Sequence, residues 1–144
     1  MSIIRIAATL CALTLAGGAS AALLSSPVMP SVFVPEISKA QAKDAILDAA
    51  RARKWRVVED KPGVMRLAYP GAGPRAEKHE LIVEVKYDGK NYSVGYVKSR
   101  GLDEDRTCRQ AKKADDPNAL CIHRNVPKWM SNLVIDIQRC ASKY

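Results

Sequence analysis

Apolar side chains between residues 38 and 54 recur every three to four positions, which is the period of an amphipathic helix. Ser38 and Gln41 have the spacing of a capping box, in which each side chain accepts a hydrogen bond from the backbone N–H of the other residue. The apolar stripe of this predicted helix consists of Ala42, Ala45, Ile46, Ala49 and Ala50. A stripe made mostly of alanine lets the helix lie close against a sheet.

The period changes to two after residue 54, which predicts a first β-hairpin. A strand over residues 55–60 is expected to place Trp55 and Val57 on one face. Pro62-Gly63 then forms the turn, because proline presets φ and glycine takes the positive φ of a type II turn. The returning strand covers residues 64–69.

A second hairpin gives the clearest alternation in the chain. Residues 79–87 and 92–96 alternate apolar and polar side chains around Asp88-Gly89, a strong signal for a two-residue turn. Pairing about this turn is expected to join Val85 with Tyr92, Val83 with Val94 and Leu81 with Tyr96. All six side chains fall on one face, so the register agrees with the pattern.

The helical period returns over residues 125–140. Asn125 is the expected N-cap, and Pro127 lies in the first turn, where its missing N–H costs little. The apolar stripe is Val126, Met130, Leu133, Ile137 and Cys140, with Trp129 beside it. The resulting order, α-β-β-β-β-α, predicts an α+β fold: a two-layer sandwich in which two helices cover one face of a four-stranded antiparallel sheet.

The first 21 residues have the pattern of a secretory signal peptide. Arg5 supplies the positive charge of a short n-region, an apolar run covers residues 6–16, and Ala19-Ser20-Ala21 offers small residues for cleavage. We therefore expect cleavage after Ala21 and a periplasmic or secreted bacterial protein. The alternative is an uncleaved N-terminal anchor, for which the apolar run is short.

Two further stretches have no regular period. Residues 22–35 carry three prolines among small residues and are expected to form an extended leader outside the core. A single domain then covers residues 36–144 and contains a long loop over 99–125. A structureless loop of this length is uncommon in a compact domain unless it is functional or pinned.

Three cysteines follow the signal peptide, namely Cys108, Cys121 and Cys140. Export places them in an oxidising compartment, where disulfides persist, and an odd number leaves one cysteine over. We favour a Cys108–Cys121 disulfide, which would pin the long loop, over Cys108–Cys140. Cys140 lies on the apolar stripe and is expected to be an inert buried thiol; a reactive or intermolecular thiol is the alternative.

The charge pattern suggests what such a domain would bind. With 23 Lys and Arg against 15 Asp and Glu the net charge is +8, and 47% hydrophobic residues are ordinary for a globular protein. No uncharged 18-residue span suits a mature membrane helix, so an integral membrane protein is not expected after cleavage. The candidate binding cations are Arg51, Arg53, Lys54, Arg56, Arg109, Lys112 and Lys113.

In an exported protein these cations would attract an anionic envelope component or a protein, and no nucleic acid, because the strand tyrosines fall on the buried face. The other interpretation of residues 51–56 is a helix C-terminus solvated by Lys and Arg. An acidic run, Asp103 to Asp105, lacks the spacing of an EF-hand and indicates a solvated loop.

Catalytic signatures are absent: the sequence has no G-x-S-x-G, H-E-x-x-H or S-x-x-K motif. His79 and His123 are its only histidines. One alternative function is a small hydrolase or redox protein that uses Cys and His. Another is a metal-binding periplasmic protein, although the spacing of Cys108, Cys121, His123 and Cys140 suits zinc poorly. We favour a structural role for His123 at the start of the last helix, with no catalytic residue, metal or cofactor.

Several short stretches resemble a group of small exported proteins and lipoproteins of Gram-negative bacteria. The matching features are a W…PG turn at Trp55 and Pro62-Gly63, a YSxxY strand at 92–96, and Ile122-His123-Arg124-Asn125 followed by Trp129. The resemblance covers residues 45–140 and departs at Val126 and Pro127, where the group has Tyr and Asn. It implies an exported, small α+β domain. Independently of the resemblance, His123, Asn125 and Trp129 are expected to be structural residues. The group has no assigned activity, so the sequence favours a non-enzymatic binding domain.

Overall fold

The computed structural model describes residues 21–24, 27–106, 108 and 120–144. Nearly all of the predicted signal peptide, and with it the proposed cleavage signal, lies outside the described residues. The elements in chain order are β1 (Ala21–Leu23), β2 (Val28–Val32), α1 (Lys39–Ala52), β3 (Arg56–Lys61), β4 (Val64–Tyr69), α2 (Pro74–Lys78), β5 (Glu80–Tyr87), β6 (Asn91–Arg100), β7 (Cys121–His123) and α3 (Asn125–Ala141).

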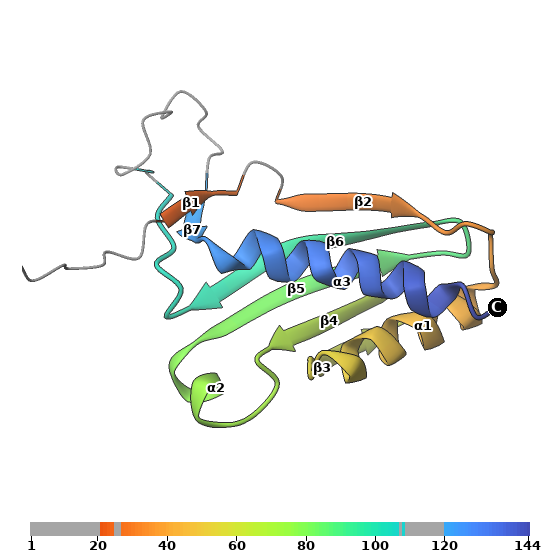
Figure 1. Cartoon of the computed structure of the whole chain (residues 1–144), viewed down its shortest axis with the longest axis horizontal. Helices are drawn as coiled ribbons and strands as arrows, with labels where there is room; N and C mark the ends of the chain where they lie inside the picture. Colours follow the sequence, from red (N-terminus) through yellow and green to blue (C-terminus); the bar gives the residue numbers. More distant parts are fainter. Residues whose placement is uncertain (1–20, 25–26, 107, 109–119) are drawn as a thin grey trace, which may run out of the picture.

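Five strands form one antiparallel sheet in the order β2-β6-β5-β4-β3, and β1 pairs with β7 in a separate two-stranded sheet. Helices α1 and α3 lie side by side over one face of the large sheet (Figure 1). The α+β class and the four consecutive antiparallel strands are therefore confirmed. The expected count was wrong, because the sheet gains a fifth strand and α2 adds a third described helix.

The fifth strand comes from the segment that we expected to lie outside the core. β2 pairs with β6 from Val28 opposite Gly95 to Val32 opposite Asn91, and Phe33 just beyond it is buried. Pro30 is tolerated because β2 is an edge strand. Pro27 and Phe33 form backbone hydrogen bonds with Tyr96 of β6 and with Lys90 just before that strand, and in an antiparallel pair only every second residue bonds to the partner strand. Pro30 belongs to the other set of residues, so its missing N–H would face the free edge. The segment is extended, as predicted, but it is part of the fold.

The register of the second hairpin differs from the expected one by two residues. Tyr87 pairs with Tyr92 and Val85 with Val94, because the turn is closed by Asp88 and Asn91 rather than centred on Asp88-Gly89. The Asp88 carboxylate accepts the backbone N–H groups of Lys90 and Asn91, both at 2.6 Å, and these bonds lower the pKa of Asp88. A shift of two residues keeps a side chain on the same face, and Val83, Val85, Tyr92 and Val94 are buried as expected. A bulge between Ile82 and Val83 places Leu81 opposite Ser99, Tyr96 is half-buried, and Ile82 is buried as well.

The core lies between the large sheet and the two long helices. The five predicted stripe residues of α1 are all buried, and the Ser38–Gln41 capping box is present. In α3 the apolar stripe is buried except for the half-buried Cys140. The N-cap of α3 is Arg124 without a side-chain cap bond, so the Asn125 assignment was wrong by one residue.

Two other expectations need correction. Trp55 is buried but precedes β3, whereas Val57 is 40% exposed although it pairs with the buried Leu67, because β3 lies at the edge of the sheet. The predicted loop over 99–125 is shorter: β6 extends to Arg100 and β7 begins at Cys121. Gly63 has the positive φ, +76°, that the Pro62-Gly63 turn requires.

Candidate functional site

Both histidines of the chain line a single recess of about 620 Å³. It lies at the end of the molecule where α2, β7 and the start of α3 meet (Figure 1). We call this cavity the histidine recess. Its lining consists of Tyr69, Pro70, Arg75, His79, Gly101, Leu102, Asp103, His123, Asn125 and Trp129.

His79 is oriented by a backbone carbonyl. Its Nδ1 lies 2.7 Å from the carbonyl oxygen of Gly101, and since a carbonyl only accepts, Nδ1 carries the proton. In the neutral ring Nε2 is then a hydrogen-bond acceptor. Gly101 permits this contact because it has φ +66°, and a Cβ there would lie 2.1 Å from the carbonyl oxygen of Lys78. The bend at Gly101 therefore places His79 on the wall of the recess.

His123 has the opposite arrangement. Its Nδ1 accepts a hydrogen bond of 3.3 Å from the backbone N–H of Asn125, which satisfies one of the unpaired N–H groups at the start of α3. Nε2 therefore carries the proton in the neutral ring and donates. The predicted role of His123 at the helix start agrees with this contact, and the same ring also lines the histidine recess.

The wall formed by residues 101–105 is pinned at several points. The His123 N–H donates to the Leu102 carbonyl oxygen at 2.8 Å, and Asp105 and Cys121 exchange two backbone bonds. Cys108 and Cys121 form a disulfide with a Cα–Cα distance of 5.2 Å, as predicted, and both are buried. Residues 101–105 therefore form a fixed side of the recess.

Tyr96 fixes the same segment from the sheet. Its hydroxyl donates to Glu104 Oε2 at 2.6 Å and also contacts Ser99 Oγ at 2.9 Å. Burial, with the Glu104 carboxylate as a second cause, raises the pKa of Tyr96 to about 12. The phenol consequently stays protonated and keeps this bond at neutral pH.

Aromatic rings form the opposite side. Trp55, Tyr69 and Trp129 stack in sequence, with ring centroids 5.0 Å apart at each step and tilted planes. Trp55 is buried, whereas Trp129 is half-buried and lines the recess. Trp129 thus offers an anchored aromatic surface to a ligand.

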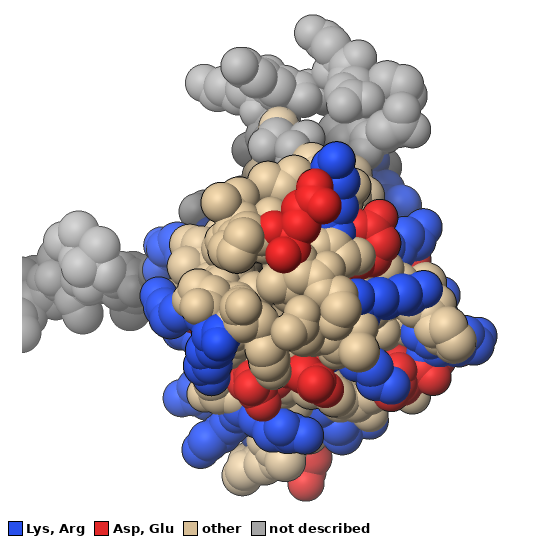
Figure 2. All heavy atoms as spheres, turned by 90° about the vertical axis from the view of Figure 1, so that its right-hand side faces the viewer, with Lys and Arg blue, Asp and Glu red and all other residues tan. Residues whose placement is uncertain are grey.

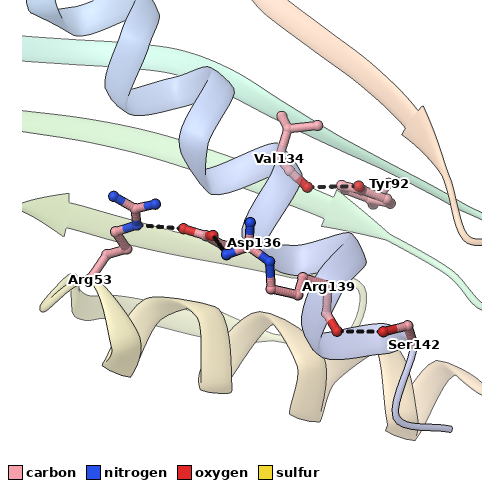
Figure 3. Close-up of polar contacts among 6 residues, drawn as sticks. All are labelled: Arg53, Tyr92, Val134, Asp136, Arg139 and Ser142. Carbon is pink, nitrogen blue, oxygen red and sulfur yellow. Dashed lines mark hydrogen bonds and ion pairs between the residues drawn. The ribbon is translucent and has the colours of Figure 1, made fainter.

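The predicted run of binding cations is largely engaged within the molecule. Arg51 pairs with Asp48 at 3.0 Å, and Arg56 pairs with Glu80 at 3.2 Å. Arg53 binds the buried carboxylate of Asp136 at 2.6 Å (Figure 3), and this contact raises the pKa of Arg53. Lys54 is exposed at the end of α1. Three of these four cations therefore share their charge with a carboxylate, while Arg109, Lys112 and Lys113 lie outside the described residues.

Charges of both signs also alternate at the opposite end of the molecule from the recess. Figure 2 shows Lys and Arg side chains there interspersed with Asp and Glu around an uncharged centre. A second hollow of about 620 Å³ lies near this end, beside the β5–β6 turn. We call it the hairpin trough. Among its lining residues, only Lys86 and Asp88 carry charge.

The described residues give no support to metal or thiol chemistry. Among them, no three His, Cys, Asp or Glu side chains gather closely enough to hold a metal ion. Nε2 of His123 carries a proton and offers no lone pair, and Cys108 and Cys121 are consumed in the disulfide. Burial raises the pKa of the remaining thiol, Cys140, which disfavours the reactive thiolate.

Comparison of the chain with protein-family models, with curated proteins and with solved structures finds no match. Within the described ranges, no helix combines the length and apolarity that crossing a bilayer requires. The disulfide is compatible with an oxidising compartment.

The sequence interpretation found part of the recess and missed part of it. His123, Asn125 and Trp129 were singled out as structural residues, and the structure brings all three to the recess. Arg75, Tyr69 and Asp103 were missed as site residues. One signal was available: Pro74 suits the first position of a helix, which places Arg75 in the short helix α2 and His79 at its C-cap.

Proposed function

We propose that the protein is an exported binding domain that captures an anionic ligand in the histidine recess. The observation that carries this proposal is the convergence of Arg75, His79 and His123 around the half-buried ring of Trp129. Among the described residues, none holds the Arg75 guanidinium in an ion pair or side-chain hydrogen bond. A guanidinium that is unpaired among the described residues is the strongest hydrogen-bond donor that the recess offers to an anion.

The hydrogen-bond roles at the rim favour the same kind of ligand. His123 presents a donor at Nε2, and the Asn125 amide adds another. Asp103 is the one carboxylate among the lining residues and Arg75 the one guanidinium, so with neutral histidines it is the hydrogen-bond donors, and not an excess of positive charge, that favour an anion. The net charge of the whole chain, +8, would draw anions toward the protein over longer distances.

The test is a titration of the oxidised protein with sodium sulfate and with inorganic phosphate at constant ionic strength. Histidine ring resonances report binding. We expect saturable shifts for both His79 and His123, lost in Arg75→Gln and kept in Arg51→Gln. Arg51 is the matched control because it is an exposed arginine paired with Asp48, away from the recess. Shifts that do not saturate, or that survive Arg75→Gln, would contradict the proposal.

A further inference from the structure

We infer that the ligand of the histidine recess is an aromatic acid and that it binds together with a proton taken up by His79. This inference rests on the proposed function and names the ligand class. It follows from two features of the recess that a simple anion site does not need. One is the aromatic wall, and the other is the position of His79 beside Arg75.

The aromatic wall selects for a ring. Trp129 is held by its contact with Tyr69, and that ring in turn packs on the buried Trp55. Such a supported indole loses little freedom when a planar ligand stacks on it. Tyr69, Pro70 and Leu102 add further apolar surface to the same cavity. A small inorganic anion would leave this surface unused, whereas an aromatic acid covers it with its ring.

The acid group of such a ligand would meet Arg75 and His79. Arg75 lies in α2, His79 is the C-cap of that helix, and both residues line the histidine recess. An anion bound in the recess attracts a positive charge on both Arg75 and His79. By linkage, anion binding and protonation of His79 then favour each other.

The geometry of His79 allows this protonation without a structural change. Nδ1–H already donates to Gly101, so the added proton goes to Nε2 and converts an acceptor into a donor. His123 differs, because a proton on its Nδ1 would break the bond from the Asn125 N–H at the start of α3. The other charged or titratable groups that line the recess with His79 are Arg75 from α2, Asp103 from the loop and His123 from β7; the neighbouring Glu80 is paired with Arg56.

The test uses calorimetric titration of the full oxidised chain with benzenesulfonate and with methanesulfonate. Both probes carry the same acid group, which does not titrate between pH 5 and 9, and only one carries a ring. We expect benzenesulfonate to bind about tenfold more tightly than methanesulfonate. We also expect its affinity to be at least about fivefold higher at pH 5.5 than at pH 8. Titrations in buffers of different ionisation enthalpy should show that the protein takes up protons when benzenesulfonate binds.

The decisive variant is His79→Asn, whose amide can still donate to the Gly101 carbonyl but does not titrate. We expect this variant to bind benzenesulfonate with the same affinity at pH 5.5 and at pH 8, and without proton uptake. Equal affinity for the two sulfonates, or proton uptake that persists in His79→Asn, would overturn this inference. The proposed binding of anions in the histidine recess would not be affected by that result. Failure of sulfate, phosphate and both sulfonates to bind would instead overturn the proposed function itself.

Discussion

Lys54 ends α1 in a conformation that glycine usually occupies. Its φ is +59°, its N–H donates to the Arg51 carbonyl at 3.1 Å, and the Trp55 N–H donates to the Ala50 carbonyl at 2.8 Å. These two bonds form a Schellman motif. Lys54, which the sequence suggested as a binding cation, thus also has a structural role at the C-terminus of α1.

We predict that Lys54→Gly stabilises the protein. Relief of the left-handed strain, partly offset by the freedom that glycine gains in the unfolded chain, should raise the free energy of unfolding by about 0.5–1 kcal/mol. Urea denaturation measures the change. Lys54→Ala is the control, because it removes the charge but keeps the strain, and a gain of equal size in that variant would refute the explanation.

Tyr96 predicts how stability responds to alkaline pH. Its pKa is about 12 in the folded protein against an ordinary value of 10.0, so the folded state holds this proton more tightly than the unfolded state does. The contribution is complete below pH 10 and is lost as pH rises through 12.

Denaturation between pH 9 and 12 should therefore show a fall in stability that is smaller in Tyr96→Phe. The exposed Tyr144 provides the control, and Tyr144→Phe should keep the full fall. An unchanged pH profile in Tyr96→Phe would contradict the assigned cause.

At the scale of elements, α1 and α3 are tied by one buried carboxylate. Asp136 is 4% exposed and accepts from Arg53 of the α1 C-cap at 2.6 Å and from Arg139 of its own helix at 2.9 Å (Figure 3). A buried charge of this kind depends on its partners. The contact explains why a polar residue lies among the apolar stripe of α3.

Asp136→Ala is predicted to lower the free energy of unfolding by about 1–3 kcal/mol, because two charge-assisted hydrogen bonds are lost. Arg51→Ala removes an exposed pair on the same helix and should change stability by less than about 0.5 kcal/mol. Thermal and urea unfolding compare the two variants. Similar effects in both would show that the Arg53–Asp136 contact adds nothing specific.

Some helices and strands of this fold could be predicted from the sequence, and others could not. α1 and the buried set of the second hairpin were predicted, because their apolar spacing matches one period and its core face. β2 was not predicted, since its prolines disfavour a central strand and only the free edge of the sheet makes Pro30 acceptable. Asp136 and Arg53 lie 83 residues apart, so the sequence pattern gives no sign that the two side chains form an ion pair.

The histidine recess is harder to predict than any single element. Its lining comes from β4, α2, the loop after β6, β7 and α3, and each contribution is one to three residues. The sequence singled out Trp129 and His123, but the fold alone brings Arg75 and His79 beside them. The sequence also did not reveal that the fold pairs three of the predicted cations at 51–56 with carboxylates.

At the scale of the whole molecule, the disulfide stabilises the fold and the recess together. It closes a loop with a sequence separation of 13, so its removal in a Cys108→Ser, Cys121→Ser double variant should cost about 3 kcal/mol. Because Cys121 also holds the 101–105 wall through Asp105, the same variant should bind sulfate more weakly. Full sulfate affinity without the disulfide would show that the wall does not depend on it.

The most direct measurement is a map of backbone amide shifts in the oxidised protein on saturation with benzenesulfonate. Our account predicts the largest changes at residues 75–79, 101–103 and 123–129, with saturation that Arg75→Gln abolishes. Changes centred on the hairpin trough at 86–93 or on the cations at 51–56 would contradict it, because those regions lie outside the histidine recess.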